Sequence, residues 1–324
     1  MNKPPLFKAV LATALLSTTL VTSLIPVYAQ KVTLPPVSPA SVTGNIVIAG
    51  SSTVYPLTQK IAEQFRADGY AGNLTVDSIG SGAGIARFCR GEIDIANASR
   101  AMNATEIAQC KAIGREPIQF RVGTDALSIV MDNGNSFVKG LNRKQIALIF
   151  SGKAKTWKDV NSAWPAETIK LFSPGTDSGT YDYFTEEIFK EETVAARRRA
   201  VVAGVPGIQL SEDDNVLVQG VESSPYAIGY FGYAYYLENK AKLKILAYEG
   251  VTPSDATVAA NRYKFSRPLF IITTAKIMTT KPQVASFVNY YLTNVNKVIK
   301  RVGYFPEPNA ALDSARTAWI SATK

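Results

Sequence analysis

The chain of 324 residues contains no histidine. Ser-His-Asp and Cys-His nucleophiles need an imidazole as general base, and most catalytic zinc sites use one as a metal ligand. The sequence therefore excludes these classes of hydrolase. A single Asp-Ser-Gly-Thr occurs at 177–180, whereas an aspartic protease needs two carboxylates that share one proton. An enzyme is not expected, and an exported hydrolase is the weaker alternative.

Long apolar runs are missing after the first thirty residues. The chain opens with MNKPPLFKAVLATALLSTTLVTSLIPVYAQ, in which two lysines precede an apolar stretch that ends in Val-Tyr-Ala. This order is typical of a signal peptide over residues 1–29, cleaved after Ala29. The alternative is an uncleaved membrane anchor. The Pro- and Ser-rich residues 30–43 predict a disordered leader.

Cysteine is almost absent, since only Cys89 and Cys110 are present. In an exported chain an even, small number of cysteines favours a disulfide. Two buried free thiols are the alternative.

The net charge of +9 shows that acids are the scarcer charged residues. Without Lys3 and Lys8 of the signal peptide the charge is near +7, which favours an anionic partner. Basic runs with interleaved aromatics are missing, so nucleic acid is not expected. The sequence also has no acidic cluster suited to a dinuclear metal, and we expect no cofactor.

What is present is a repeated order of short apolar segment, small polar loop and helical pattern. Apolar segments at 45–50, 73–80 and 168–173 are each followed by Ser, Thr and Gly and then by apolar residues at helical spacing. Strands that alternate with helices indicate an α/β fold. Two further segments, 124–132 and 261–270, look extended and would suit strands that cross between two lobes.

The three loops place hydroxyl groups and glycine at the first turn of a helix. The first N–H groups of a helix have no internal acceptor, and the helix dipole adds partial positive charge there. Glycine lets an anion approach these groups closely. One such loop is usually a simple N-cap, but three of them predict a site for an oxyanion.

In these segments the chain resembles the periplasmic phosphate-binding protein of the phosphate ABC transporter. The motifs that carry the resemblance run in order from residue 45 to about residue 308: AGSSTVYPL, GSGAGIARF, GEIDIANASRAM, IALIFSGKAKTW, GTDSGTYDYF, SPYAIGYFGYAYY and RVGYFPEP.

The resemblance implies a two-lobed periplasmic binding protein fold of type II with two crossover strands as the hinge. Lobe I would comprise residues 44–124 and 265–324, and lobe II residues 125–264. It also implies a periplasmic monomer that closes on phosphate and delivers it to permease subunits in the membrane. Another tetrahedral anion, sulfate or a molybdate-like one, is the alternative ligand.

Matching the family's ligand positions residue by residue implies phosphate contacts from Ser52, Thr53, Ser81, Ser178, Gly179 and Thr180. The sequence departs from the family at two places. Pro174 stands where many relatives have an arginine, and Arg100 where many have an aspartate.

We therefore predict that Arg100 supplies the guanidinium, with Arg87 as the alternative. For the carboxylate that accepts the phosphate proton we predict Asp177. Asp182 and Asp94 are weaker candidates.

Overall fold

A computed structural model describes residue 1 and residues 32–324, except 177 and 212. Its strands are β1 (Asn45–Gly50), β2 (Asn73–Ser78), β3 (Ile95–Ala98), β4 (Ile118–Asp132), β5 (Gly140–Leu141), β6 (Lys170–Pro174), β7 (Gln209–Ser211), β8 (Ala227–Gly232), β9 (Leu243–Ile245), β10 (Ala247–Tyr248) and β11 (Ser266–Thr273). Its helices are the 3₁₀ helix η1 (Pro39–Ser41) and α1 (Tyr55–Ala67), α2 (Ser81–Cys89), α3 (Ala104–Ala112), α4 (Arg143–Phe150), α5 (Trp157–Val160), α6 (Gly179–Ile188), α7 (Ala195–Ala203), α8 (Asp214–Glu222), α9 (Tyr233–Asn239), α10 (Asp255–Ala259), α11 (Ala275–Thr280), α12 (Pro282–Val302) and α13 (Asn309–Ala322).

One mixed sheet connects most of the strands, in the order β2-β1-β3-β11-β4-β8-β6-β7, and β9 also pairs with β4. The strands β1, β2 and β3 are parallel, as are β6, β7 and β8. At the centre β11 runs antiparallel to β4, with Arg267 opposite Asp125. The predicted α/β class is confirmed.

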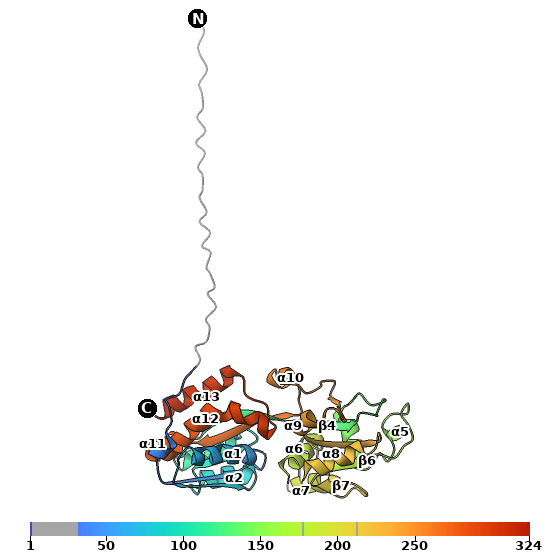
Figure 1. Ribbon diagram of the computed structural model, residues 1–324, viewed down its shortest axis with the longest axis horizontal. Coiled ribbons are helices and arrows are strands. Elements are labelled where there is room, and N and C mark those ends of the chain that lie inside the picture. Colours follow the sequence, from blue (N-terminus) through green and yellow to red (C-terminus); the bar gives the residue numbers. More distant parts are fainter. Residues whose placement is uncertain (2–31, 177, 212) are drawn as a thin grey trace. The chain divides into compact units, whose positions relative to one another are not determined.

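The hydrophobic core is divided along these two central strands. One cluster of buried residues draws on residues 34–122 and 269–319, and two others draw on residues 126–265 together with Phe305. The first is the core of lobe I, and the others form that of lobe II. Figure 1 shows α1, α2, α11, α12 and α13 together in lobe I and α6, α7 and α8 in lobe II.

The strands β4 and β11 pass from one lobe to the other. In β4, Phe120 belongs to the core of lobe I and Ile129 to that of lobe II. Leu269 of β11 lies in lobe I, while Phe265, just before it, lies in lobe II. The two predicted crossover strands are therefore present. We propose the lobe boundaries at residues 124 and 265, where the cores change.

Three local differences from the sequence predictions have simple causes. The loop SGAG is the first turn of α2, because the turn falls on Gly80, whose φ is +87°. The segment 226–236 does not stay extended, since α9 begins at Tyr233. Residues 32–43 of the predicted leader are packed onto lobe I. Leu34 is buried there, and Asn289 Nδ2 donates to the Pro35 carbonyl at 3.1 Å.

Lobe I contains a disulfide between Cys89, at the end of α2, and Cys110 in α3. It fastens two helices that pack against each other. Among the described residues, no helix is both long and apolar enough to cross a bilayer. Apart from Met1, the predicted signal peptide lies outside the described residues.

Candidate functional site: a cavity between the lobes

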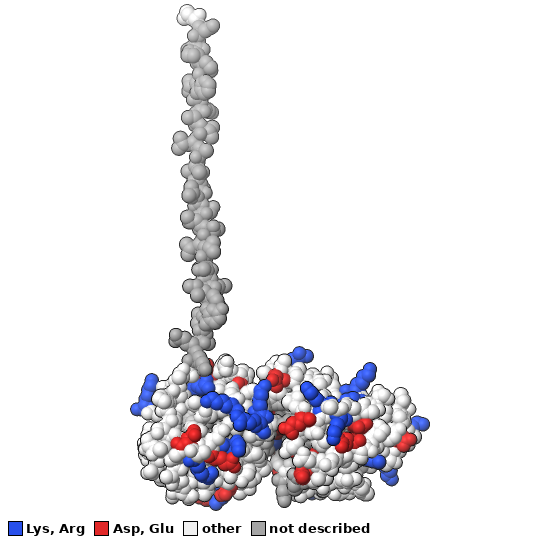
Figure 2. Space-filling model, viewed as in Figure 1, with Lys and Arg blue, Asp and Glu red and all other residues white. Residues whose placement is uncertain are grey.

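A cavity of about 520 Å³ lies where three helices begin and the crossover strands pass. Its lining is Ser51, Ser52, Thr53, Gly80, Ser81, Gly82, Ser99, Arg100, Ala101, Gly179, Asp182, Tyr183, Glu186, Arg267 and Pro268. The residues before Gly179 belong to lobe I, and Gly179 to Glu186 belong to α6 of lobe II. On the face that Figure 2 shows, basic and acidic side chains lie close together near the junction of the lobes.

The loop between β1 and α1 presents backbone donors to this cavity. Ser51 starts the turn, since its carbonyl accepts from Tyr55 N at 3.0 Å and its Oγ accepts from Val54 N at 3.3 Å. Across the described part of the chain, the N–H groups of Ser52 and Thr53 have no acceptor. Both are first-turn donors of the kind that binds an oxyanion.

The start of α2 forms the neighbouring part of the wall. The N–H groups of Ile79 and Gly80 both donate to the Gly50 carbonyl, which fixes the turn against β1. Ser81 Oγ accepts from Ser99 N at 3.1 Å and lies 3.2 Å from Ser99 Oγ. The Ser81 side chain is thus held by Ser99, directly after β3. The first-turn N–H groups of α2 have no acceptor among the described residues and remain for a ligand.

The start of α6 approaches the first loop very closely. A Cβ atom added to Gly179 would lie 2.4 Å from Thr53 Oγ1 and 2.5 Å from Ser52 Oγ. Ser178 and Thr180 are not part of the lining. Ser178 is the N-cap of α6, and its Oγ accepts from Thr180 N at 3.1 Å. Asp177, the predicted proton acceptor, lies outside the described residues.

Arg267 is a cavity residue that the sequence analysis missed. Its residue exposure is 8%, and its guanidinium joins both lobes. Nε donates to Asp125 Oδ2 at 3.2 Å, Nη1 to Ser99 Oγ at 3.3 Å, and Nη2 to Thr53 Oγ1 and to the Gly179 carbonyl at 2.8 Å. A guanidinium has five N–H donors, so one N–H on Nη1 has no acceptor among the described residues and can meet an anion.

The Tyr183 ring supports this guanidinium from lobe II. The Arg267 Cζ atom lies 4.3 Å from the ring centroid, a cation–π geometry. Burial raises the pKa of the Tyr183 hydroxyl, so the ring stays neutral beside the cation. The guanidinium is therefore fixed by an acid, a ring and two loops.

Arg100, the predicted anchor, lines the cavity in a different way. Its side chain is 44% exposed and forms a two-pronged ion pair with Glu106, at 2.7 and 2.8 Å. Arg87, the alternative, pairs with Glu92 and does not line the cavity. Arg100 thus stays a prediction, and Arg267 is the second candidate for the same task.

Two acidic residues of α6 line the cavity, Asp182 and Glu186. Burial raises the pKa of Asp182, while the guanidinium of Arg199, which is hydrogen-bonded to it, opposes the shift. Asp94 directly precedes β3, pairs with Lys281 at 2.7 Å and does not line the cavity. Of the acids predicted as proton acceptors, Asp182 is therefore the one that lines the cavity among the described residues.

The structure brings Ser52, Thr53, Ser81, Arg100 and Gly179 together in one cavity, as the sequence analysis expects of ligand residues. It gives Ser178 and Thr180 a supporting place just behind the wall. A signal for Arg267 existed in the sequence. KFSRPLF puts one charge inside an extended apolar segment, and TDALSIVMD puts an acid in the other predicted crossover strand.

Comparison with known proteins places this arrangement in a family. Residues 35–295 match the family described as the PBP superfamily domain. The chain is 40% identical over 304 residues to Protein SphX of Synechococcus elongatus, covering 90% of this chain and 86% of that protein. It is 33% identical over 270 residues to phosphate-binding protein PstS of Staphylococcus aureus, covering 82% and 79% respectively.

Solved structures agree with this assignment. A possible phosphate binding protein from Planctomyces limnophilus superposes with a TM-score of 0.78 at 35% identity, covering 87% of this chain and 100% of that chain. An ABC-type phosphate transport receptor from Vibrio cholerae has a TM-score of 0.66 at 24% identity, covering 80% and 99%, and shows likeness of fold. The family predicted from the motifs is confirmed, and the chain belongs to the PBP superfamily of two-lobed binding proteins.

Proposed function

We propose that the protein captures inorganic phosphate between its lobes and delivers it to an ABC transporter. The observation that carries the proposal is the meeting of first-turn donors from three helices with the buried guanidinium of Arg267. Such donors suit a small oxyanion without water around it. The relatives named for phosphate binding support this anion over the alternatives.

Capture depends on closure of the lobes around the anion. Lobe I offers the N–H groups of Ser52 and Thr53 and the start of α2, while lobe II adds the start of α6. Arg267 bonds to Thr53 on one side and to Gly179 on the other. An anion that touches both lobes stabilises the closed arrangement by its differential contacts, which is a hinge closure.

The cavity contains no arrangement for turnover among its described residues. The serines of the lining have no imidazole beside them, because the chain has no histidine. We therefore infer binding and release without chemical change. From the signal-like segment 1–29 and the family resemblance we further propose export to the periplasm and delivery of phosphate, as a monomer, to permease subunits.

Calorimetric titration of the purified protein with phosphate and with sulfate tests the proposal. We expect tight one-to-one binding of phosphate and much weaker binding of sulfate. Sulfate binding at least as tight as phosphate binding would assign the site to another tetrahedral anion. Lack of binding by either anion would refute the proposal.

A further inference from the structure

The segment that follows α12 makes a third connection between the lobes. We name residues 303–308 the C-terminal strap. It begins at Gly303, whose left-handed φ of +96° ends α12, and it leads into α13. Both helices pack in lobe I, through Val295 and Leu312 among others. Since the strap joins two helices of lobe I, it could connect them without contacting lobe II.

The strap nevertheless enters lobe II through Phe305. The Phe305 side chain is 4% exposed and belongs to the lobe II core, with its ring 4.8 Å from that of Tyr233. Its backbone pairs with the crossover strand β4: Thr124 N donates to the Phe305 carbonyl at 3.0 Å, and Phe305 N donates to the Thr124 carbonyl at 2.8 Å. The strap is thus fastened at the point where β4 changes lobes.

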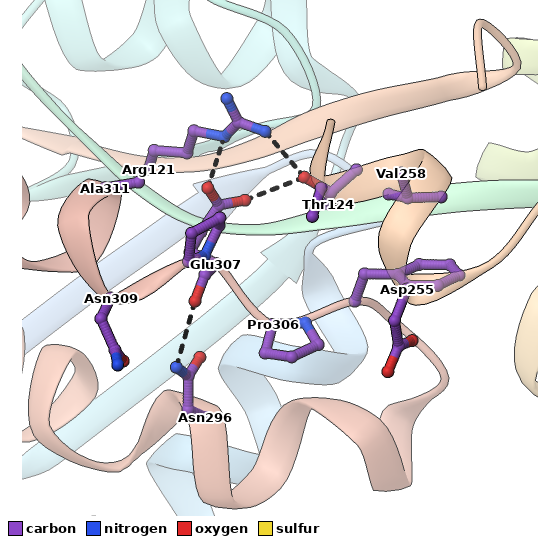
Figure 3. Close-up of a pocket in the computed structure, with 12 residues that line it drawn as sticks. Arg121, Thr124, Asp255, Val258, Asn296, Pro306, Glu307, Asn309 and Ala311 are labelled. Atoms are coloured by element: carbon purple, nitrogen blue, oxygen red, sulfur yellow. Dashed lines mark hydrogen bonds and ion pairs between the residues drawn. The ribbon is translucent and has the colours of Figure 1, made fainter. Parts of the chain in front are cut away.

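Glu307 fastens the strap to β4 a second time, as Figure 3 shows. Its residue exposure is 3%. Thr124 Oγ1 donates to Glu307 Oε1 at 2.8 Å, and Arg121 Nε lies 3.0 Å from Oε2 in an ion pair. Asn296 Nδ2 of α12 donates to the Glu307 carbonyl at 3.3 Å. Arg121, Thr124 and Glu307 line a cavity of about 560 Å³. Because this space is empty of side chains, the hydrogen bonds of Glu307, and not close packing around it, hold the strap to β4 here.

Tyr304 connects the strap to the phosphate cavity without lining it. Its hydroxyl donates to the Thr53 carbonyl at 2.7 Å. Thr53 Oγ1 accepts from Arg267. Thr53 is therefore held from two directions. Arg267 of the crossover strand β11 bonds to the Thr53 side chain, and Tyr304 of the strap bonds to the Thr53 carbonyl. The Tyr304 bond fixes the orientation of the peptide group that follows Thr53, and the Arg267 bond fixes that of the Thr53 side chain.

We propose that Tyr304 is a positioning residue for phosphate, and that the strap couples the hinge to the Ser52–Thr53 loop. This inference rests on the proposed function. Movement of β4 at Thr124 is passed through Phe305 and Glu307 to the strap, and through Tyr304 to Thr53. The loop then has its binding geometry only when the hinge is in its closed position.

The substitution Tyr304→Phe tests the proposal by removing one hydroxyl group. We expect phosphate affinity to fall about tenfold, because the buried Thr53 carbonyl loses its donor. The matched control is Tyr70→Phe, since Tyr70 also donates at 2.7 Å to a backbone carbonyl, that of Gly44, at the other end of lobe I. It should lower the denaturant midpoint comparably and leave phosphate affinity unchanged.

A second pair of variants tests the coupling at Glu307. Glu307→Gln keeps an oxygen that accepts from Thr124, whereas Glu307→Ala removes it. We expect the glutamine variant to retain most of the phosphate affinity and the alanine variant to lose several-fold. If the alanine variant does not fold, Tyr304→Phe and Glu307→Gln still decide the matter.

The outcomes separate this inference from the proposed function. A wild-type protein that does not bind phosphate refutes the function. A wild-type protein that binds phosphate, with Tyr304→Phe binding equally well, overturns the positioning role. Equal affinity losses in Tyr304→Phe and Tyr70→Phe would also overturn it, because the effect would then be one of general stability.

Discussion

The two walls of the cavity differ in what they offer an anion. The wall from lobe I carries hydroxyl groups and free N–H groups, with Arg100 at its edge. The wall from lobe II carries the start of α6 together with two acids, Asp182 and Glu186. Arg267 stands between them on a crossover strand.

This difference indicates a division of labour. Lobe I provides donors that any tetrahedral oxyanion would accept, since an N–H group does not distinguish phosphate from sulfate. Lobe II adds carboxylates, which tolerate a ligand with a proton to donate and oppose one that has none. We therefore expect affinity to depend mainly on lobe I and Arg267, and selectivity mainly on lobe II.

The largest expected effect concerns selectivity. A site that requires a hydrogen bond rejects an analogue without the donor by ~10⁴–10⁵-fold. Asp182→Asn should remove much of this preference, because an amide can donate to sulfate. Asp177→Asn is the matched variant, since Asp177 is the acceptor predicted from sequence. Competition between phosphate and sulfate, measured by calorimetry, identifies the acceptor. Unchanged selectivity in both variants would contradict a role for either acid.

Next in size is the loss of the central cation. Arg267→Ala should cost ~2–5 kcal/mol of phosphate binding, as truncation of one partner of a buried charge pair does. Arg100→Ala should cost less, because Arg100 is half-exposed and paired with Glu106. Phosphate titration of the two variants gives the ranking. A larger loss of phosphate affinity in Arg100→Ala than in Arg267→Ala would show that Arg100 supplies the guanidinium, as predicted from the sequence.

The next effect concerns the stability that the disulfide between Cys89 and Cys110 gives to lobe I. Closing a loop of this size stabilises the chain by ~3 kcal/mol in the chain-entropy model. The double substitution Cys89→Ala with Cys110→Ala should lower the free energy of unfolding by about that amount. Thiol titration of the unfolded, unreduced wild-type protein should find no free thiols. Two free thiols would refute the pairing.

A smaller effect is expected from blocking the contact between the walls. Gly179→Ala puts a Cβ atom 2.9 Å from the backbone N of Thr53, and such overpacking costs ~1–3 kcal/mol. Phosphate affinity should fall, and the decrease in radius on binding, measured by small-angle scattering, should be reduced. Gly232→Ala is the control, since a Cβ there meets nothing within 4 Å. Full closure of the Gly179 variant would show that the contact does not limit the closed state.

The smallest effect is one of pH. Burial raises the pKa of Asp182, so its carboxylate is protonated at a higher pH than an ordinary aspartate. Any preference that depends on this carboxylate is therefore present at neutral pH and declines as pH falls through the raised pKa. Competition titrations between pH 7 and pH 4 should show the decline in the wild type and not in Asp182→Asn. A decline of the same size in the variant would assign it to the ligand.

The sequence was most informative where structure is local. The strands β1, β2 and β6 and the helix starts that follow them depend on short patterns of apolar and small residues, and these were predicted. Arg267 could not be assigned in this way, because its role depends on the pairing of β11 with β4 that sets it opposite Asp125. The pairing of Arg100 with Glu106 likewise depends on where α3 begins.

Tertiary packing also explains why residues 32–43 of the predicted leader are ordered on lobe I. Its prolines and serines predicted disorder, but Leu34, Val37 and Val42 find apolar surface on lobe I. A composition rule counts residues without knowing what surface lies near them. The same limit applies to the C-terminal strap, whose motif was recognised while its passage into lobe II was not.

The division of the core also sets an order of events as the chain emerges. Lobe II is built almost entirely from one continuous stretch, residues 126–265, whereas the core of lobe I needs residues from both 34–122 and 269–319. Its strand β3 pairs with β11, and its helix α1 packs on α12. We therefore expect lobe II to be able to condense first during synthesis or export. The lobe I wall of the cavity, which carries most of the N–H and hydroxyl donors, is then completed last, after α12 and α13 have packed.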